Sequence, residues 1–301
     1  MHSLLRGNAL PALAAAILWG GGDFSGGMGV KSAGGGVRAA LRVVLLSHLT
    51  SFVVLVAIAR IRGDAFPHGA YLAWGIGAGV AGGLSLTCFY TALSRGAMGA
   101  SAAVSGLLAA AIPAAVSMGR EGSPGALPML GFAVAGMAIW LIAAGPASDS
   151  GLASDSARGA GRETAVLAML AGVGFGIYFV ALKMAGPAGV VWPMATARMG
   201  SLSTCSLVFL GLRVGGGKAE AVRFGRRAAG WALSTALLDT SGNLLFLAAT
   251  RAGRLDVAAV LASLYPASTI LLAALALSEL PTRRQALGMA TAAVAVVLIA
   301  L

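Results

Sequence analysis

Three ionisable residues and one amide have the types and the positions to do chemistry. Asp23, Asp239 and Arg198 each interrupt a stretch of sequence that is otherwise apolar, and Asn243 follows Asp239 by four residues. Residues four apart share one face of a helix, so we expect Asn243 beside Asp239. An ionisable residue at the centre of a membrane costs at least ~2.5–3.5 kcal/mol, and its presence there marks a functional candidate by default.

These residues suggest a proton-binding or substrate-binding site. A carboxyl group in an apolar cavity binds a proton more readily than in water, so it can take up and release protons during a cycle. Arg198 could hold an anionic group of a substrate or neutralise Asp239. A structural alternative stays open, in which Arg198 and Asp239 pair to hold helices together and Asp23 lies at a water-exposed helix end beside Gly26.

Aromatic and proline residues complete the set of candidates. Four aromatic side chains offer apolar surface suited to an organic substrate, although packing is the default role for any one of them: Trp19, Phe24, Tyr178 and Tyr265. Pro113 and Pro266 each remove a helical hydrogen bond and are candidate hinges. His48 lies in an apolar stretch, where a hydrogen-bonded packing role is expected over a proton relay.

The elements that carry these residues must be apolar helices. The chain has 301 residues, of which 58% are apolar and 10% charged, with a mean hydropathy of +0.88. A soluble domain carries about 25% charged residues, so the composition excludes a soluble enzyme or a nucleic-acid-binding protein. The net charge of +11 indicates anionic lipid headgroups as partners rather than nucleic acid. The two cysteines have no metal or redox spacing, and we expect no metal and no cofactor.

Ten apolar stretches are long enough to span a membrane, which takes about 20 residues each. The sequence therefore predicts an all-α integral membrane protein with ten transmembrane helices. The predicted spans are 9–30, 39–59, 71–93, 97–118, 126–145, 164–184, 193–212, 229–250, 254–277 and 284–301. Within the third span, Gly75, Gly79 and Gly83 repeat every fourth residue and predict close packing against a neighbouring helix.

An internal repeat divides these spans into two groups of five. A shift of 156 residues places Trp19-Gly20 on Phe175-Gly176 and Ala92–Arg95 on Ala248–Arg251. Five spans are an odd number, so the second half must enter the membrane from the opposite side, which makes an inverted repeat. We expect a first five-helix repeat over residues 1–146, a polar linker over 147–163 and a second repeat over 164–301.

Three motifs in this order resemble a known family. Leu18–Phe24 is similar to an LWGxxxF signature of a first helix, and Ala259–Pro266 is similar to the family's "vlaslyP". Ser278–Leu280 followed by Gln285–Gly288 resembles its "gE…qllG". Together they resemble the drug/metabolite transporter superfamily, EamA type. The resemblance implies movement of a small metabolite or drug, mostly by export, and cytoplasmic termini.

The function expected from residues and resemblance together is secondary transport by alternating access. The cargo would be a small organic metabolite or drug, exported across a bacterial inner (plasma) membrane with proton coupling or exchange. Phosphate-loop and HExxH motifs are absent from the sequence, so no enzyme activity is expected. A lipid flippase or a non-transporting scaffold is the alternative. More Lys and Arg lie on the side opposite the termini, which argues against cytoplasmic termini. Either a monomer or a homodimer fits the sequence.

Overall fold

The computed structural model describes residues 7–95, 98–143, 155–214, 224–277 and 282–300. All regular secondary structure in these ranges is helical. The motif Ser278–Leu280 lies outside the described residues. The helices are α1 (Ala9–Ser32), α2 (Gly36–Arg62), α3 (Gly69–Arg95), α4 (Met98–Glu121), α5 (Ala126–Ala143), α6 (Asp155–Ala185), the short 3₁₀ helix η1 (Gly186–Ala188), α7 (Val191–Val214), α8 (Arg226–Ala252), α9 (Leu255–Ala262), α10 (Tyr265–Leu277) and α11 (Arg283–Ala300).

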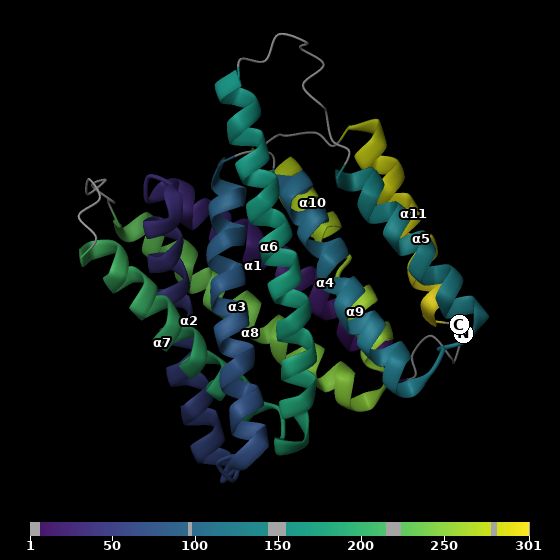
Figure 1. Ribbon diagram of the computed structural model, residues 1–301, viewed down its shortest axis with the longest axis horizontal. Coiled ribbons are helices and arrows are strands. Elements are labelled where there is room, and N and C mark those ends of the chain that lie inside the picture. The colour runs from purple at the N-terminus through teal and green to yellow at the C-terminus, as the bar shows by residue number, and fades with distance from the viewer. Residues whose placement is uncertain (1–6, 96–97, 144–154, 215–223, 278–281, 301) are drawn as a thin grey trace.

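The long helices form a bundle in which distant segments of the chain lie side by side (Figure 1). Helix α1 packs against α8, and α3 packs against α6 and α7. Helix α2 packs against α7 and α8, while α4 packs against α6. Helices α5 and α11 pack against each other along one edge of the bundle. Most of the large interfaces therefore join an element from the first part of the chain to one from the second.

A ridge of glycines explains why α3 and α7 approach so closely. A Cβ placed on Gly75 would overlap the Thr196 side chain, and one on Gly79 would overlap the backbone of Ala197. The third glycine, Gly83, faces Ser201 in the same way. Small residues at four-residue spacing allow two helix backbones to meet, and the predicted packing role of these glycines is confirmed.

The helices that contain the two candidate hinge prolines differ. Helix α4 is continuous through Pro113, whereas the chain turns at Ser263 and Leu264 between α9 and α10, just before Pro266. Proline cannot donate to the carbonyl four residues earlier, so the break before Pro266 leaves the carbonyl of Ala262 without its helical donor.

The polar segment between the two apolar groups is shorter than expected. Helix α6 begins at Asp155, inside the range 147–163 that was expected to be a linker. The apolar run begins only at Thr164, but a helix extends past its apolar part where the flanking residues are compatible with helix, as Ala and Arg are here. The first turns of α6 project from the bundle at the top of Figure 1.

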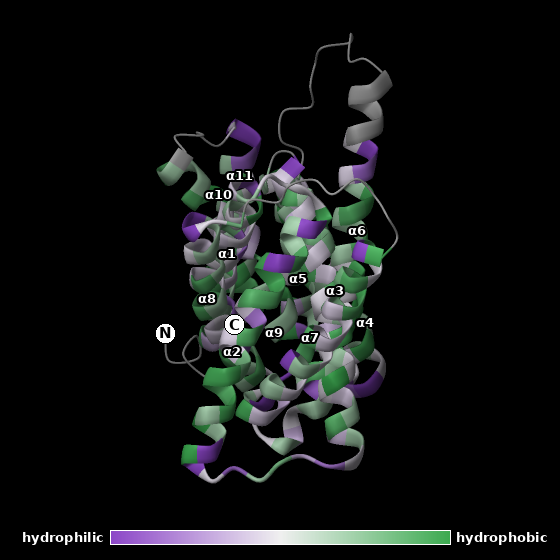
Figure 2. Cartoon of the chain, turned by 90° about the vertical axis from the view of Figure 1, so that its left-hand side faces the viewer, coloured by the Kyte–Doolittle hydropathy of each residue, from purple (hydrophilic) through white to green (hydrophobic). Residues whose placement is uncertain are grey.

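Six of the described helices are long and apolar enough to cross a membrane: Gly36–Arg62, Gly69–Arg95, Met98–Glu121, Gly161–Ala188, Arg226–Ala252 and Leu255–Ala276. The last of these runs through the break between α9 and α10. Ala126–Ile142 is a shorter apolar helix. Hydrophilic residues gather at the two ends of the bundle and hydrophobic ones along its length (Figure 2). The chain is thus a multi-pass membrane protein.

Candidate functional site

A cavity lies inside the bundle, where helices from both parts of the chain meet. Its walls come from α1, α2 and α3 on one side and from α6, α7, α8 and α10 on the other. The residues that line it are Trp19, Asp23, His48, Gly79, Gly82, Gly83, Leu86, Phe175, Tyr178, Phe179, Ala197, Arg198, Ser201, Asp239, Asn243 and Tyr265. The structure thereby brings together most of the residues that the sequence singled out.

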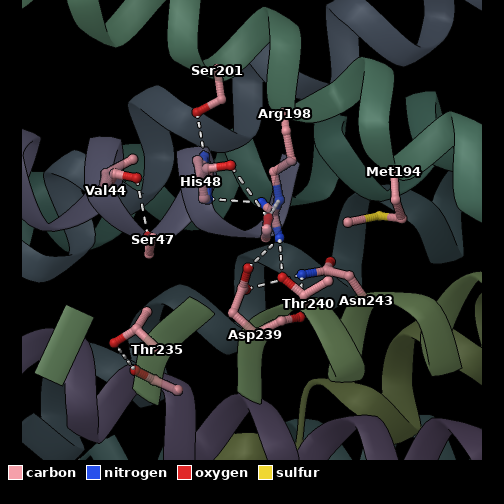
Figure 3. A network of polar contacts seen from close by, with 12 residues as sticks. Val44, Ser47, His48, Met194, Arg198, Ser201, Thr235, Asp239, Thr240 and Asn243 are labelled. Atoms are coloured by element: carbon pink, nitrogen blue, oxygen red, sulfur yellow. Dashed lines mark hydrogen bonds and ion pairs between the residues drawn. The ribbon is translucent and has the colours of Figure 1, made fainter. Parts of the chain in front are cut away.

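Arg198 is the centre of the polar network beside this cavity. Its side chain is 3% exposed, and its Nη2 donates to Asp239 Oδ2 at 2.5 Å. The Nε group donates to Ser51 Oγ at 2.8 Å, and Nη1 contacts His48 Nε2 at 2.7 Å. Figure 3 shows Arg198 between His48 on one side and Asp239 on the other. With these bonds made, the guanidinium has little remaining capacity to bind an anionic ligand.

Asp239 is held from two directions. Its Oδ1 accepts a hydrogen bond from Asn243 Nδ2 at 2.9 Å, while its Oδ2 accepts from Arg198. The amide of Asn243 in turn accepts a hydrogen bond from the Tyr178 hydroxyl at 2.7 Å. Because both carboxyl oxygens accept, Asp239 is a carboxylate in this arrangement. Asn243 lies beside Asp239, as the four-residue spacing predicted.

The hydrogen bonds of His48 define its protonation state. Arginine is only a donor, so His48 Nε2 must accept from Arg198 and carry no proton. The other ring nitrogen, Nδ1, then donates to Ser201 Oγ at 2.6 Å. His48 is therefore a neutral imidazole that joins α2 to α7. The expected hydrogen-bonded packing role is confirmed.

Asp23 has no such partners. Its residue is 8% exposed and it lines the cavity, but within the described part of the chain it makes no hydrogen bond and no ion pair. The backbone of α1 meets α8 at this level, since a Cβ on Gly22 would lie 3.3 Å from the Asp239 amide nitrogen. The two acids therefore share one cavity but not one network. Asp23 does not lie at a water-exposed helix end, so that part of the structural alternative is wrong.

The aromatic candidates divide into those at the cavity and one that is elsewhere. Trp19 stacks on Phe179 with ring centroids 5.1 Å apart, and both rings line the cavity. Tyr178 and Tyr265 also line it. Phe24 does not, because it packs edge-on against Trp231 with centroids 6.1 Å apart. Phe24 therefore packs between α1 and α8 and does not line the cavity.

Several polar side chains of the network were not predicted. Ser51, Ser201 and Thr240 surround Arg198 and His48. A usable signal was present, because Ser51 follows His48 by three residues and Ser201 follows Arg198 by three, which places each pair on one helix face. Hydroxyl residues are common in apolar helices, so they draw attention only once the charged residue beside them is known. In the described ranges, no group of three or more His, Cys, Asp and Glu residues could hold a metal ion.

The cavity is small, and a larger hollow lies at one end of the bundle. The centre of a water molecule can reach about 40 Å³ of the cavity, enough for a few waters and too little for an organic molecule. The hollow measures about 720 Å³ and is lined by the α2–α3 and α6–α7 connections and the end of α8. In its wall, Trp192 donates from Nε1 to the Asp64 carbonyl at 2.7 Å and meets the Phe66 ring edge-on.

Comparison with known proteins identifies the second half of the chain. Residues 163–301 match the model of the EamA-like transporter family. No curated protein matches the chain. A solved structure, titled only as the crystal structure of a protein, is similar over 97% of this chain and 95% of its own, with a TM-score of 0.69 and 17% identity. At that identity the similarity shows the fold alone. Residues 163–301 are thus similar to the EamA-like transporter family, which lies within the drug/metabolite transporter superfamily.

Proposed function

We propose that the protein is a secondary transporter that carries a small organic molecule through the central cavity by alternating access. The observation that carries this proposal is the cavity itself, which contains buried ionisable groups and is lined by both parts of the chain. Transporters place their cargo at the interface between repeats, so that moving one repeat against the other exposes the cargo to each side in turn. The similarity of residues 163–301 to a transporter family supports the same conclusion.

The packing of the helices supports the inverted-repeat part of the proposal. An inverted repeat would relate α1 to α6, α2 to α7, α3 to α8, and α4 to the pair α9 and α10. Under this correspondence, each interface between two helices has an equivalent interface in the bundle. The α1–α8 interface becomes α6–α3, and α2–α8 becomes α7–α3. Likewise α4–α6 becomes the contact of α10 with α1, and α5–α11 maps onto itself. Ten spans in two repeats, over residues 1–146 and 164–301, would produce this pattern.

The small volume of the cavity fits a closed state of the cycle. Phe66 and Trp192 line the hollow, and opening at this end is proposed to separate the contacts that these two side chains make. The hollow is on the side of both chain termini, since the α2–α3 and α6–α7 connections lie on that side. On the proposed orientation this is the cytoplasmic face of a bacterial plasma membrane, and export would begin there.

Energy coupling is proposed to use Asp23. Asp239 already accepts from Arg198 and Asn243, so protonating it would break a network of hydrogen bonds. Asp23 has no bond to lose, and a proton can bind and leave it without dismantling the helix packing. Residue type and position made both acids candidates, and their surroundings favour Asp23.

Cysteine accessibility tests alternating access at this cavity. Leu86 lines the cavity, whereas Leu55 is fully buried on α2 away from it. In a background with Cys88→Ser and Cys205→Ala, we expect a membrane-impermeant thiol reagent to modify Leu86→Cys from either side of sealed vesicles. The matched control Leu55→Cys should react from neither side. Modification of Leu86→Cys from one side only, or from none, would contradict alternating access and fit a non-transporting scaffold.

A further inference from the structure

The helices around the cavity form two groups that meet across it. In the first, which we call the α1 group, α1 packs against α8, α9 and α10. In the second, the α6 group, α6 packs against α3 and α4. Alternating access opens the space between two such bodies at one end of the bundle while the other end stays closed. The contacts between the groups at each end therefore decide which side the cavity faces.

Arg254 joins the two groups at the end of the bundle where the chain termini lie. It precedes α9 in the α1 group, and its Nη2 donates to the carbonyl oxygen of Gly122, directly after α4, at 2.6 Å. Its Nη1 donates to the Glu121 carbonyl at 3.3 Å. Asp256 in the first turn of α9 is fully buried, and its two carboxylate oxygens accept from Arg254 Nε at 3.1 Å and Nη2 at 2.8 Å. This two-bond pair fixes the orientation of the guanidinium beside the end of α4.

Lys183 makes a second connection at the same end. It lies in the last turn of α6, and its Nζ donates to the carbonyl oxygens of Thr250 and Gly253, where α8 ends. The last carbonyls of a helix lack helical donors and carry a partial negative charge, so a cation placed there is stabilised. Lys183 belongs to the α6 group and its acceptors to the α1 group. Both Arg254 and Lys183 therefore bond across the interface that must open at this end.

The equivalent contact at the opposite end is apolar. At the shift of 156 residues, Arg254 corresponds to Met98 and Lys183 corresponds to Gly27. These two residues also meet between the groups, because a Cβ on Gly27 of α1 would lie 3.1 Å from the terminal methyl carbon of Met98 on α4. Such a contact is held by dispersion forces, which are weak for each pair of atoms. The repeat thus places Arg254 and Lys183 in the interface at one end, and Met98 and Gly27 in it at the other.

The charged contacts can open without leaving a buried charge unpaired. Arg254 and Asp256 both lie in the α1 group, so their ion pair moves as one unit. The carbonyls of Glu121 and Gly122 belong to exposed residues, and Lys183 is only partly buried. Opening at this end therefore exchanges hydrogen bonds within the protein for hydrogen bonds to water, which has a modest net cost.

We propose that Arg254 and Lys183 form a latch that closes the cavity toward the termini end, so that the unloaded protein opens more often at the opposite end. The inference rests on the proposed function, since it names residues that set the direction in which the same cavity faces. Opening at the termini end breaks the bonds of the latch, whereas opening at the opposite end separates the Met98 methyl group from Gly27. The open state that keeps the latch is therefore the more populated of the two.

The rate of thiol modification from each side tests the latch. Leu86→Cys is used in the background of Cys88→Ser and Cys205→Ala, in sealed vesicles whose termini side is identified with a C-terminal tag. We expect a membrane-impermeant maleimide to react more slowly from the termini side. The double variant Arg254→Met with Asp256→Asn removes the latch contact and leaves no unpaired buried carboxylate. It should raise the rate from the termini side at least about threefold, because hydrogen bonds from a charged group are lost, and lower the rate from the opposite side.

Two further variants separate the latch from a general loosening of the bundle. Lys183→Met keeps the Arg254–Asp256 pair and should also raise the rate from the termini side. Arg95→Ala is a matched control, because Arg95 Nη1 bonds to Glu163 Oε2 at 3.0 Å between α3 and α6, inside one group. We expect this control to leave both rates unchanged.

The outcomes distinguish the latch from the transport function. Equal rates from the two sides before the latch is changed, no increase from the termini side in a latch variant, or the same increase in Arg95→Ala would each overturn the latch. In those cases modification of Leu86→Cys from both sides still supports alternating access, and the proposed function stands. Modification from one side only, or from neither, would overturn the proposed function and the latch with it.

Discussion

The two carboxyl groups of the central cavity lie on helices that pack together, yet their surroundings are opposite. On the α8 side, Asp239 accepts hydrogen bonds at both oxygens from Arg198 and Asn243. On the α1 side, Asp23 is as buried as Asp239 and accepts no hydrogen bond within the described residues. A group that holds helices together cannot change its charge freely, whereas a group without partners can. We therefore propose a structural role for Asp239 and an exchangeable proton for Asp23.

The largest loss of stability is expected when Arg198 is left without its counterion. Asp239→Ala keeps a buried guanidinium but removes its only carboxylate, and breaking one side of a buried pair costs about 3–5 kcal/mol. We expect a large fall in the thermal unfolding midpoint of the purified protein, together with low expression.

A double variant tests whether Asp239 stabilises the protein through its ion pair with Arg198. Arg198→Met together with Asp239→Leu replaces both charges with apolar side chains, which is often neutral or stabilising for a buried pair. We expect its unfolding midpoint to recover well above that of Asp239→Ala. A double variant no more stable than Asp239→Ala would show that the ion pair is not what Asp239 contributes.

A smaller fall in the unfolding midpoint is expected when Ser51, which contacts Arg198 from α2, is changed. Ser51→Ala removes the acceptor of the Arg198 Nε–H group, which has a donor–acceptor distance of 2.8 Å. An unsatisfied buried donor costs about 1–3 kcal/mol, so the midpoint should fall by less than in Asp239→Ala. Ser47→Ala is a matched control on the same helix, since its hydroxyl bonds only to the Val44 carbonyl. Equal losses in both variants would contradict a specific role for Ser51.

The smallest change in stability is expected at the other acid. Asp23→Asn removes no hydrogen bond or ion pair of the described residues, and the amide is similar in size to the carboxyl. We expect the free energy of unfolding to change by less than about 1 kcal/mol. A loss comparable to that of Asp239→Ala would show that Asp23 has a structural partner, and the contrast between the two acids would fail.

Much of the fold could be predicted from hydropathy and spacing. The apolar stretches coincide with the helices, and the glycine ridge of α3 meets α7 as expected. Hydropathy did not predict where helices extend into polar sequence, as α6 does from Asp155. Nor did local sequence separate Pro113, inside a continuous helix, from Pro266, which follows a break. Both carry the same backbone signal, and the packing around them decides the outcome.

The candidate site was harder to predict because it departs from the internal repeat. At the shift of 156 residues, Asp23 corresponds to Phe179 and Asp239 corresponds to Gly83. The repeat therefore predicts the frame of helices but no second copy of either acid. Intramembrane charge identified Asp23, Asp239 and Arg198 as candidates. It could not tell the paired acid from the unpaired one, since that depends on which helices meet.

The most direct test of this account is transport by Asp23→Asn in liposomes that contain the purified protein. Two modes are compared with the unaltered chain for a small organic molecule that the unaltered chain transports: accumulation driven by an imposed pH gradient, and counterflow exchange of labelled for unlabelled cargo without a gradient. Because Asn cannot carry the proton, we predict that gradient-driven accumulation falls at least tenfold while counterflow remains measurable. Full gradient-driven accumulation in Asp23→Asn, at normal expression, would contradict the assignment of the coupled proton to Asp23.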